Sequence, residues 1–282
     1  MSPIGETMVA RYLTIHSPPS PLFKFPRGDG HLGRAVVDEM RVGTGGWAYF
    51  QIPGMDSLEA YARAFDYVEV GSTFYQIPPL DQARVWRRRV PDHFAFTVRC
   101  HRGITHAHAF DPTDRVIDQM EAMVRIAQVL RAQALHLLTP PTFRFGSTDV
   151  ENLGRLLDAI PENSVPLALE ARAYGEEPLP ADLRGLMEER GIVHSVDVSK
   201  GDPQIASSTL YTRLFGKGYH TVYQFSDEEL QQIYNKAQDG DYRRALFTFH
   251  GVRMYSDAGR FLSQLVKKVR PSAQARGQQK LS

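Results

Sequence analysis

Cysteine is almost absent from this chain, because Cys100 is the only one among its 282 residues. A single cysteine excludes a framework of intramolecular disulfides and suits a reducing compartment. Long apolar runs are missing as well: no stretch reaches the roughly 18–20 residues of a membrane span, and the N-terminus lacks the apolar core of a signal peptide. We therefore expect a cytoplasmic protein without a membrane partner.

Neither sign of charge is in excess. The chain has 33 lysines and arginines against 32 aspartates and glutamates, a net charge of +1. It thus lacks an overall field that would draw it onto nucleic acid or an anionic membrane. A nucleic-acid partner is not excluded, but a local patch would have to hold it. With 42% hydrophobic and 23% charged residues, the composition is that of an ordinary globular protein.

Regular periodicity is lacking at both ends of the chain. Residues 1–40 contain HSPPSPLFKFPRGDG, whose prolines and glycines interrupt any helix or strand, so no packed element is expected before Met40. We predict that 1–40 is a disordered or mis-annotated extension, and that a chain beginning at Met40 keeps its melting temperature. The polar stretch 270–282 is predicted to be a disordered tail. One domain remains, at 41–269.

Within this domain, short β-like runs alternate with amphipathic helical patterns. The eight runs lie at 41–47, 67–74, 94–100, 135–139, 167–172, 192–198, 209–215 and 245–250. The helical patterns lie at 57–65, 80–89, 113–133, 148–160, 181–190, 226–238 and 256–269. Only the connection from the sixth strand to the seventh, SKGDPQIASS, is too short for a proper helix. Strict alternation implies a parallel sheet, and eight repeats imply closure into a (β/α)8 TIM barrel. An open doubly wound sheet is the alternative.

The working groups of such a barrel lie at the carboxyl ends of its strands and in the loops that follow. If alternate residues face inward, the charged and imidazole side chains at these ends are Glu69, Arg99, His101, Glu170, Arg172, Asp197, Arg213 and His250. Just beyond them lie Trp47, Tyr49, Thr73, Phe74, Tyr75, Thr105, His106, Phe215 and Tyr219. Aromatic rings in such places can stack on sugar rings or bases.

The carboxylates and arginines from different strands form a charge-balanced cluster. In a functional interpretation Arg99, Arg172 and Arg213 grip an anion. Glu170 or Glu69 is then the general base and His106 the acid. The remaining candidates are Asp197 for catalysis and, for substrate binding, Thr73, Tyr75, Trp47, His101 and His250. The alternative is a purely structural set of buried ion pairs that fills the barrel.

No cofactor is predicted from the residue pattern. The sequence has no HExxH or paired-cysteine spacing, and the arginines already neutralise the charge that would recruit a metal, although a divalent metal stays possible. Strand alternation turns Cys100 toward the helices, so we expect a buried and inert thiol.

Eight segments, in order, resemble the blocks of the YecE-like proteins, domain of unknown function 72. They are RVGTGGWAY, VEVGSTFYQIP, FAFTVRCHRGITH, LALEAR, SVDVS, YTRLFG, YQFSDEEL and HGVRMYSDAGRF. The resemblance implies a TIM barrel and no established activity. The family's polar positions fall on Glu69, Ser72, Thr73, Tyr75, His106, Glu170, Arg172, Asp197 and Arg213.

Three positions depart from the pattern of that family. Arg99 stands where a lysine is usual, which weakens Schiff-base or lysine-base chemistry. Phe215 replaces the histidine of the usual R-x-H-G block, and HGV replaces a turn that contains asparagine. We predict an enzyme that acts on a small anionic, sugar-like or phosphorylated molecule by acid/base chemistry. The alternatives are a metal-dependent phosphodiesterase or endonuclease-like barrel acting on nucleic acid, and a protein that binds a small ligand without turning it over.

Overall fold

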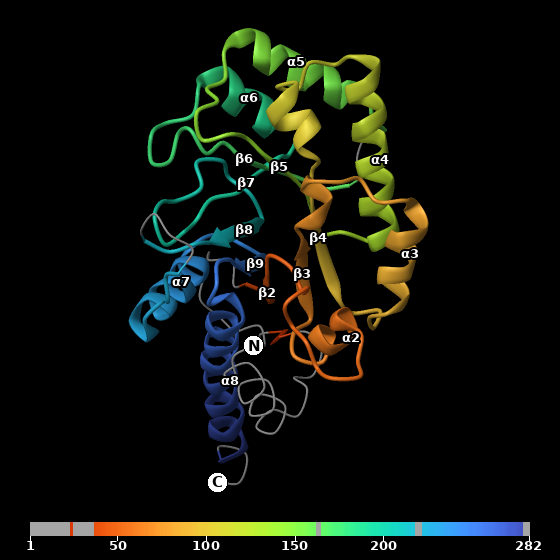
Figure 1. Cartoon of the computed structure of the whole chain (residues 1–282). Coiled ribbons are helices and arrows are strands. Elements are labelled where there is room, and N and C mark those ends of the chain that lie inside the picture. Colours follow the sequence, from red (N-terminus) through yellow and green to blue (C-terminus); the bar gives the residue numbers. More distant parts are fainter. Residues whose placement is uncertain (1–22, 25–36, 162–164, 218–221, 279–282) are drawn as a thin grey trace.

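The strands of the molecule surround a common axis and the helices lie outside them (Figure 1). The computed structural model describes residues 23–24, 37–161, 165–217 and 222–278. The eight parallel strands are β2 (Glu39–Thr44), β3 (Tyr67–Val70), β4 (Ala95–Arg99), β5 (Leu135–Leu138), β6 (Leu167–Glu170), β7 (Val193–His194), β8 (Thr209–Leu214) and β9 (Arg244–Phe249). The α-helices are α2 (Ser57–Ala62), α3 (Leu80–Arg88), α4 (Asp114–Leu130), α5 (Ser147–Asp158), α6 (Ala181–Glu189), α7 (Asp227–Asp239) and α8 (Met254–Gln278).

The sheet closes almost completely on itself. Its hydrogen-bonded order is β7-β6-β5-β4-β3-β2-β9-β8, and the seam between β7 and β8 is closed by a parallel bridge of Val196 with Thr212. At this seam the Arg213 amide donates to the Val196 carbonyl at 3.3 Å, and the Val198 amide donates to Thr212 Oγ1 at 3.2 Å. The connection from β7 to β8 contains no helix, as predicted. The predicted TIM barrel is therefore confirmed, and the open sheet is not adopted.

Alternation along the strands creates two apolar layers. Outward residues such as Val68 and Val70 join the helices in the large core, which also contains Cys100. Inward residues form a small layer at the amino-terminal end of the barrel, with Tyr67 and Tyr211 as its largest members. Cys100 is fully buried, as predicted, and burial raises the pKa of its thiol to about 12.

Local capping residues fix the start of helices next to the strand ends. Asp56 Oδ1 accepts from the Leu58 and Glu59 amides at 2.9 and 3.3 Å at the start of α2. Ser226 and Glu229 form a capping box at the start of α7, which satisfies amide groups that a helix leaves unpaired. No helix in the described part of the chain is both long and apolar enough to cross a membrane.

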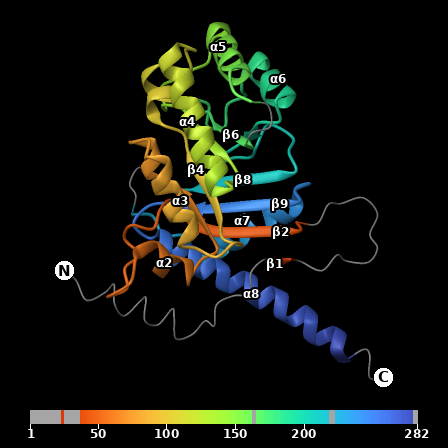
Figure 2. The ribbon, with the colours of Figure 1, turned by 90° about the vertical axis from the view of Figure 1, so that its right-hand side faces the viewer.

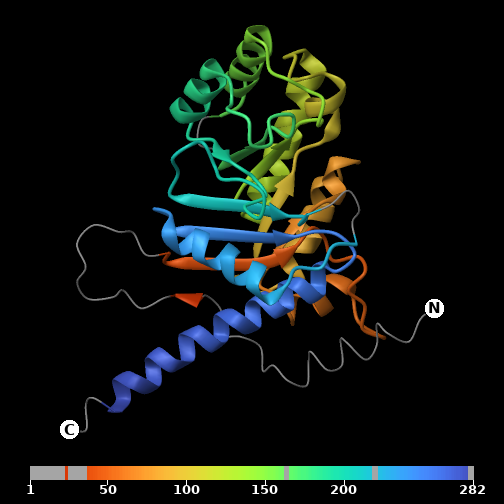
Figure 3. The ribbon, with the colours of Figure 1, turned by 90° about the vertical axis from the view of Figure 1, so that its left-hand side faces the viewer.

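The two ends of the domain differ from the prediction. A short strand β1 (Phe23–Lys24) pairs antiparallel with β2, and Val37 is fully buried, so packing begins before Met40. The reason is that β2 would otherwise leave an edge unpaired there. At the other end α8 continues to Gln278 and extends past the sheet (Figures 2 and 3), although the sequence predicted a disordered tail from residue 270. Residues 1–22, 25–36 and 279–282 lie outside the described residues, so the disorder predicted there is untested.

Candidate functional site

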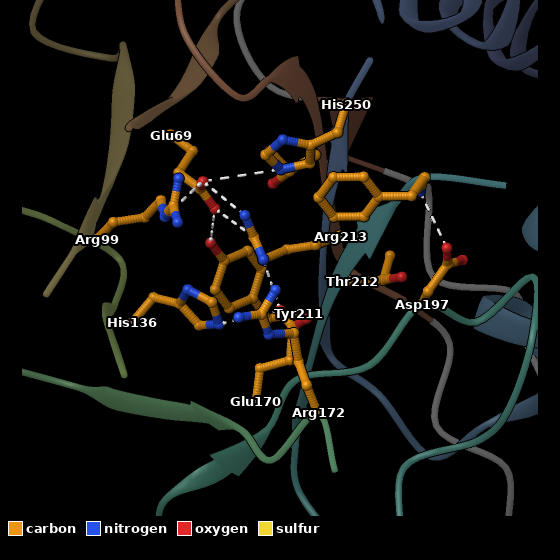
Figure 4. Close-up of polar contacts among 12 residues, drawn as sticks. Glu69, Arg99, His136, Glu170, Arg172, Asp197, Tyr211, Thr212, Arg213 and His250 are labelled. Carbon is orange, nitrogen blue, oxygen red and sulfur yellow. Dashed lines mark hydrogen bonds and ion pairs between the residues drawn. The ribbon is translucent and has the colours of Figure 1, made fainter. Parts of the chain in front are cut away.

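Two buried glutamates face one arginine at the carboxyl ends of three strands (Figure 4). Arg213, from β8, donates from Nε to Glu69 Oε2 at 2.8 Å and from Nη2 to Glu69 Oε1 at 3.3 Å. It also donates from Nη1 to Glu170 Oε2 at 2.6 Å. The Glu69 side chain is 0% exposed and that of Glu170 is 15% exposed. Arg213 therefore serves as the shared counter-ion of both carboxylates.

This arrangement keeps both glutamates ionised. Burial on its own would raise the pKa of each carboxyl, but Arg213 outweighs it, and the net pKa of Glu69 and Glu170 lies well below its ordinary value. The two carboxylates in turn outweigh the effect of burial on Arg213 and raise the pKa of its guanidinium. Both carboxylates are therefore ionised at neutral pH and able to accept a proton, although a lowered pKa also makes each of them a weaker base.

A chain of hydroxyl groups supports Glu69 from inside the barrel. The Tyr211 hydroxyl donates to Glu69 Oε2 at 2.6 Å and lies 3.3 Å from Thr97 Oγ1. Tyr67 continues the chain, with its hydroxyl 2.9 Å from Thr97 Oγ1 and 2.7 Å from Thr248 Oγ1. All of these side chains are buried, and a fully connected polar network of this kind fixes the orientation of the groups that it contains.

Arg99 and Arg172 lie nearer to the solvent and have fewer partners than Arg213. The Arg99 guanidinium stacks on the Phe74 ring at 4.2 Å. Its Nε is 3.8 Å from Glu69 Oε1 and is buried without a hydrogen bond. Arg172 Nε donates to the Thr139 carbonyl at 2.7 Å, and its Nη2 is 3.5 Å from His106 Nε2. These two arginines are thus held in place while nitrogen atoms remain available for a ligand.

His106 lies on the single wide turn η2 (Gly103–Ala107) that follows β4. Its Nδ1 is 2.8 Å from Thr105 Oγ1, and its ring meets the Phe74 ring edge-on at 4.9 Å. Burial lowers the pKa of His106, and the neighbouring Arg172 and Arg99 lower it further. A neutral imidazole is better suited to accept a proton than to supply one, which differs from the acid role that the sequence suggested.

His250 is held between a glycine and an aromatic ring. A Cβ on Gly45 would lie 2.3 Å from the His250 ring, so only glycine leaves room for it. On the other side the Phe215 ring stacks on the imidazole, with centroids 4.4 Å apart and planes 10° apart. His250 Nε2 is 3.7 Å from Glu69 Oε1 and has no hydrogen bond. Burial, with Arg213 nearby, lowers the pKa of His250 to about 3.

Asp197 does not join the cluster of Arg213 and the two glutamates. Its Oδ2 accepts from the Phe215 and Gly216 amides at 2.9 and 3.2 Å. Its Oδ1 accepts from the Ser199 amide at 3.0 Å and from Ser199 Oγ at 2.6 Å. These contacts tie the loops after β7 and β8 together and account for the aspartate without a role in chemistry.

Four further candidates have mainly structural contacts. Thr73 Oγ1 donates to the Val70 and Arg99 carbonyls at 2.8 and 2.7 Å, and His101 Nδ1 accepts from the Gly103 amide at 3.1 Å. Trp47 packs edge-on against Trp86 of α3 at 5.5 Å. Tyr75 is 64% exposed. Another aromatic candidate, Tyr219, lies outside the described residues.

Three inward-facing residues escaped the sequence analysis. His136 Nε2 is 3.4 Å from Glu170 Oε2 without the geometry of a hydrogen bond, and burial lowers the pKa of its ring. Ser195 Oγ is buried without a partner, and Tyr211 carries the hydroxyl bound to Glu69. Alternation from Arg213 and Asp197 would have found Tyr211 and Ser195, whereas no candidate at the end of β5 offered a starting point for His136. In the described residues no group of three or more His, Cys, Asp or Glu side chains is placed to hold a metal ion.

Two curated bacterial proteins are similar to part of the chain. UPF0759 protein YunF of Bacillus subtilis is 27% identical over 164 residues, 56% of this chain and 56% of its own length. UPF0759 protein YecE of Escherichia coli is 30% identical over 144 residues, 49% of this chain and 51% of its own length. The matched region thus spans about half the length of these relatives.

Solved structures extend the likeness to most of the chain. A DUF72 family protein from Enterococcus faecalis has a TM-score of 0.65 at 16% identity and covers 84% of this chain and 99% of its own. A xylose isomerase domain containing protein from Salmonella typhimurium has a TM-score of 0.53 at 17% identity and covers 81% of this chain and 97% of its own. At these identities the likeness shows the fold alone. The profile of the family described as "Protein of unknown function DUF72" matches residues 41–280, and the chain therefore belongs to the DUF72 family.

Proposed function

We propose that this protein is an enzyme that binds a small anionic molecule, sugar-like or phosphorylated, at the carboxyl ends of its strands and moves a proton by acid/base chemistry. The observation that carries the proposal is the surplus of positive charge beside ionised carboxylates. Arg213 is already shared by Glu69 and Glu170, whereas among the described residues Nη1 and Nη2 of Arg99 and Nη1 of Arg172 have no hydrogen-bond partner. A guanidinium with free donors suits a carboxylate or phosphate group.

The contacts favour different roles for the individual charges. Glu170 is the better general base, because its side chain is 15% exposed while that of Glu69 is 0% exposed. Arg99 and Arg172 would bind the anion. Arg213 directs Nε, Nη1 and Nη2 to the two glutamates, so it positions them and has little left for a ligand. A general base must lie within hydrogen-bond reach of the proton that it removes, which Glu170 alone of the two carboxylates can offer to a molecule in the mouth.

Anion binding is tested by thermal melts of the full chain at low salt. Phosphate and sulfate should raise the melting temperature, since any ligand of the native state stabilises it by mass action. Neutral sugars at the same concentrations serve as the control. If sugars stabilise the protein and the anions do not, the proposed role of Arg99 and Arg172 is wrong.

The chemical step is tested with the molecules that the protein itself retains. Mass spectrometry of small molecules released from the purified chain gives the candidate substrate, and Glu170→Gln should still retain it while turnover falls by about 10²–10⁴-fold, the usual contribution of a general base. Recovery of unchanged molecule from wild type would instead favour a binding protein. Loss of turnover with a chelator, restored by Zn²⁺ or Mn²⁺, would favour the metal-dependent phosphodiesterase.

A further inference from the structure

The exposed large apolar side chains of the described residues lie in loops that follow four of the strands. These strands are β2, β3, β8 and β9, which are neighbours in the order β3-β2-β9-β8. The residues, called here the apolar arc, are Tyr49, Tyr75, Phe215, Val222 and Val252. Single exposed apolar residues need no explanation, but several in the loops around one site suit the apolar part of a ligand.

Positive charge follows the strands next to these, and the two sets meet where the Arg102 guanidinium lies 6.0 Å from the centroid of the Tyr75 ring. Arg99 and Arg102 lie at and after the end of β4, and Arg172 follows β6, in the part of the sheet ordered β6-β5-β4. These three arginines are called here the basic arc. The mouth therefore has two faces of different chemistry, and a ligand that uses both must itself have an anionic part and an apolar part.

Phe215 is the member of the apolar arc whose ring is best fixed. One face of the ring is covered by the parallel stack on His250 at 4.4 Å, and the Arg213 guanidinium lies 5.3 Å from its centroid. The residue is nevertheless 37% exposed, so the exposed part belongs to the other face and the edges. A ring that is already held in place can stack on a second flat ring at little cost in conformational entropy.

Glu69 and His250 connect the stack to the basic arc. Glu69 Oε1 is 3.7 Å from His250 Nε2 and 3.8 Å from Arg99 Nε, and Figure 4 shows His250 and Arg99 on either side of that carboxylate. Phe215, which stacks on His250, and Arg99 therefore belong to the same mouth.

We propose that the molecule bound at this mouth carries a flat aromatic ring joined to its anionic group, as in an aryl phosphate or a nucleoside phosphate. The ring lies against Phe215 and the anion against the basic arc. This inference rests on the proposed function and narrows its substrate class. It assigns to Phe215 the part of a specificity-determining residue that acts by stacking.

The test uses two phosphate monoesters that differ only in the ring. Methyl phosphate and phenyl phosphate are titrated into the full chain by calorimetry at low salt and pH 8, where both are mainly dianions. Phenyl phosphate should bind about tenfold more tightly, which is the lower end of the effect of stacking on an aromatic side chain. Phe215→Leu should abolish that tenfold preference and leave methyl phosphate binding unchanged, whereas Phe215→Tyr, which keeps the ring, should retain the preference.

The possible failures are distinguishable. Equal binding of the two esters to wild type overturns the ring-stacking inference and leaves the proposed anion site standing. A preference that survives in Phe215→Leu also overturns it, because the ring would then bind elsewhere. If neither ester binds, the anion site of the proposed function fails as well. Circular dichroism of each variant confirms that it is folded, so that a lost preference reports on the stack.

Discussion

Arg213 occupies the place that a cation must occupy when two carboxylates face one another inside a barrel. Its guanidinium binds Glu69 through two nitrogen atoms and Glu170 through a third. Buried charges of this kind persist only when they are paired and hydrogen-bonded. The sequence pattern predicts Arg213 as an anion-binding residue, but its partners in the folded chain favour a role in positioning the two glutamates.

We expect Glu69→Gln to lower the free energy of unfolding by about 3–5 kcal/mol, because it removes the charge of the fully buried carboxylate that accepts two of the three hydrogen bonds from Arg213. The side chain is 0% exposed and binds both Arg213 and Tyr211. Urea unfolding at pH 7 measures the effect. Glu170→Gln is the matched control and should cost less, since its side chain is 15% exposed and Arg213 keeps its bonds to Glu69. An equal cost in both variants would contradict this ranking.

A second prediction at the scale of one residue concerns the space that Gly45 leaves for the His250 ring. In Gly45→Ala the new Cβ would lie 2.3 Å from the His250 ring, so the ring must move and its stack on Phe215 is disturbed. We expect a loss of about 1–3 kcal/mol, as for other overpacked sites. Gly185→Ala is the control: in helix α6 a Cβ there meets nothing within 4 Å, so the exchange should stabilise by about 0.5–1 kcal/mol. Melting temperatures decide, and a Gly45→Ala protein as stable as wild type would show that His250 is not confined.

Among the eight barrel strands, β7 is the shortest, and a side chain helps to hold it in place. His194 is the last residue of β7, and its Nδ1 accepts a hydrogen bond of 3.0 Å from the backbone amide of Gln204. This bond ties the strand to the loop between β7 and β8, where other connections have a helix. Only the unprotonated nitrogen can accept this bond. Burial lowers the pKa of His194 to about 4.

This lowered pKa makes part of the stability depend on pH. His194 takes up a proton near pH 6.5 in the unfolded chain but only near pH 4 in the folded chain. Its contribution to the free energy of unfolding is therefore complete above pH 6.5 and is lost as the pH falls toward 4. Between pH 7 and 5 His194 should account for about 2 kcal/mol of lost stability. His194→Asn, whose amide oxygen can accept the same bond, should remove that part.

The measurement is urea unfolding of wild type and His194→Asn at pH 7 and pH 5. Burial raises the pKa of Asp257 to about 6, so protonation of this group stabilises the folded chain as the pH falls over the same range. Asp257 acts equally in both proteins, and the diagnostic quantity is therefore the difference in pH dependence between wild type and His194→Asn. Equal pH dependence in both would mean that His194 does not resist protonation.

On the scale of the elements, sequence patterns were sufficient for the barrel. The strands could be located because each is a short apolar run between turn residues, and the helices because their apolar residues recur at helical spacing. The short connection after β7 also could be read directly. The patterns could not show which side chains form ion pairs across the barrel. Such pairs depend on the relative heights of β3, β6 and β8, and the shear of the closed sheet determines these heights.

The same limit applies to the candidate site. Glu69, Glu170 and Arg213 could be found because each faces inward at a strand end. The sequence could not show that Asp197 is engaged by the Phe215 and Gly216 amides, because such contacts depend on loop conformation. It also missed the hydroxyl of Tyr211, which lies one layer deeper on the same face of β8 as Arg213.

On the scale of the whole molecule, the boundary of the domain lies earlier than the sequence suggested. Val37 is fully buried, and Glu39 accepts from Arg41 Nε at 2.8 Å and from Arg244 Nε at 3.0 Å. These contacts join the first strand of the barrel to the last.

Two truncations test this boundary. A chain that begins at Val36 loses, of the described elements, only the two-residue strand β1 and should melt slightly below the full chain, whereas a chain that begins at Met40 should lose about 2 kcal/mol more for the buried valine alone, or several further degrees in a domain of this size. If the chain beginning at Met40 melts like the full protein, the contacts of Val37 and Glu39 contribute nothing and the original boundary holds.

The central claim is that the mouth binds an anion through the arginines that the two glutamates leave available. Calorimetric titration of inorganic phosphate at low salt into wild type, Arg172→Gln and Arg125→Gln tests it most directly. Arg125 lies on helix α4 with a side chain that is 59% exposed, and helices of a barrel lie outside its mouth, so its variant should bind like wild type. Arg172→Gln should bind at least about tenfold more weakly, the usual cost of losing a hydrogen bond to a charged group. Unchanged binding by Arg172→Gln, or loss of binding in Arg125→Gln, would contradict the claim.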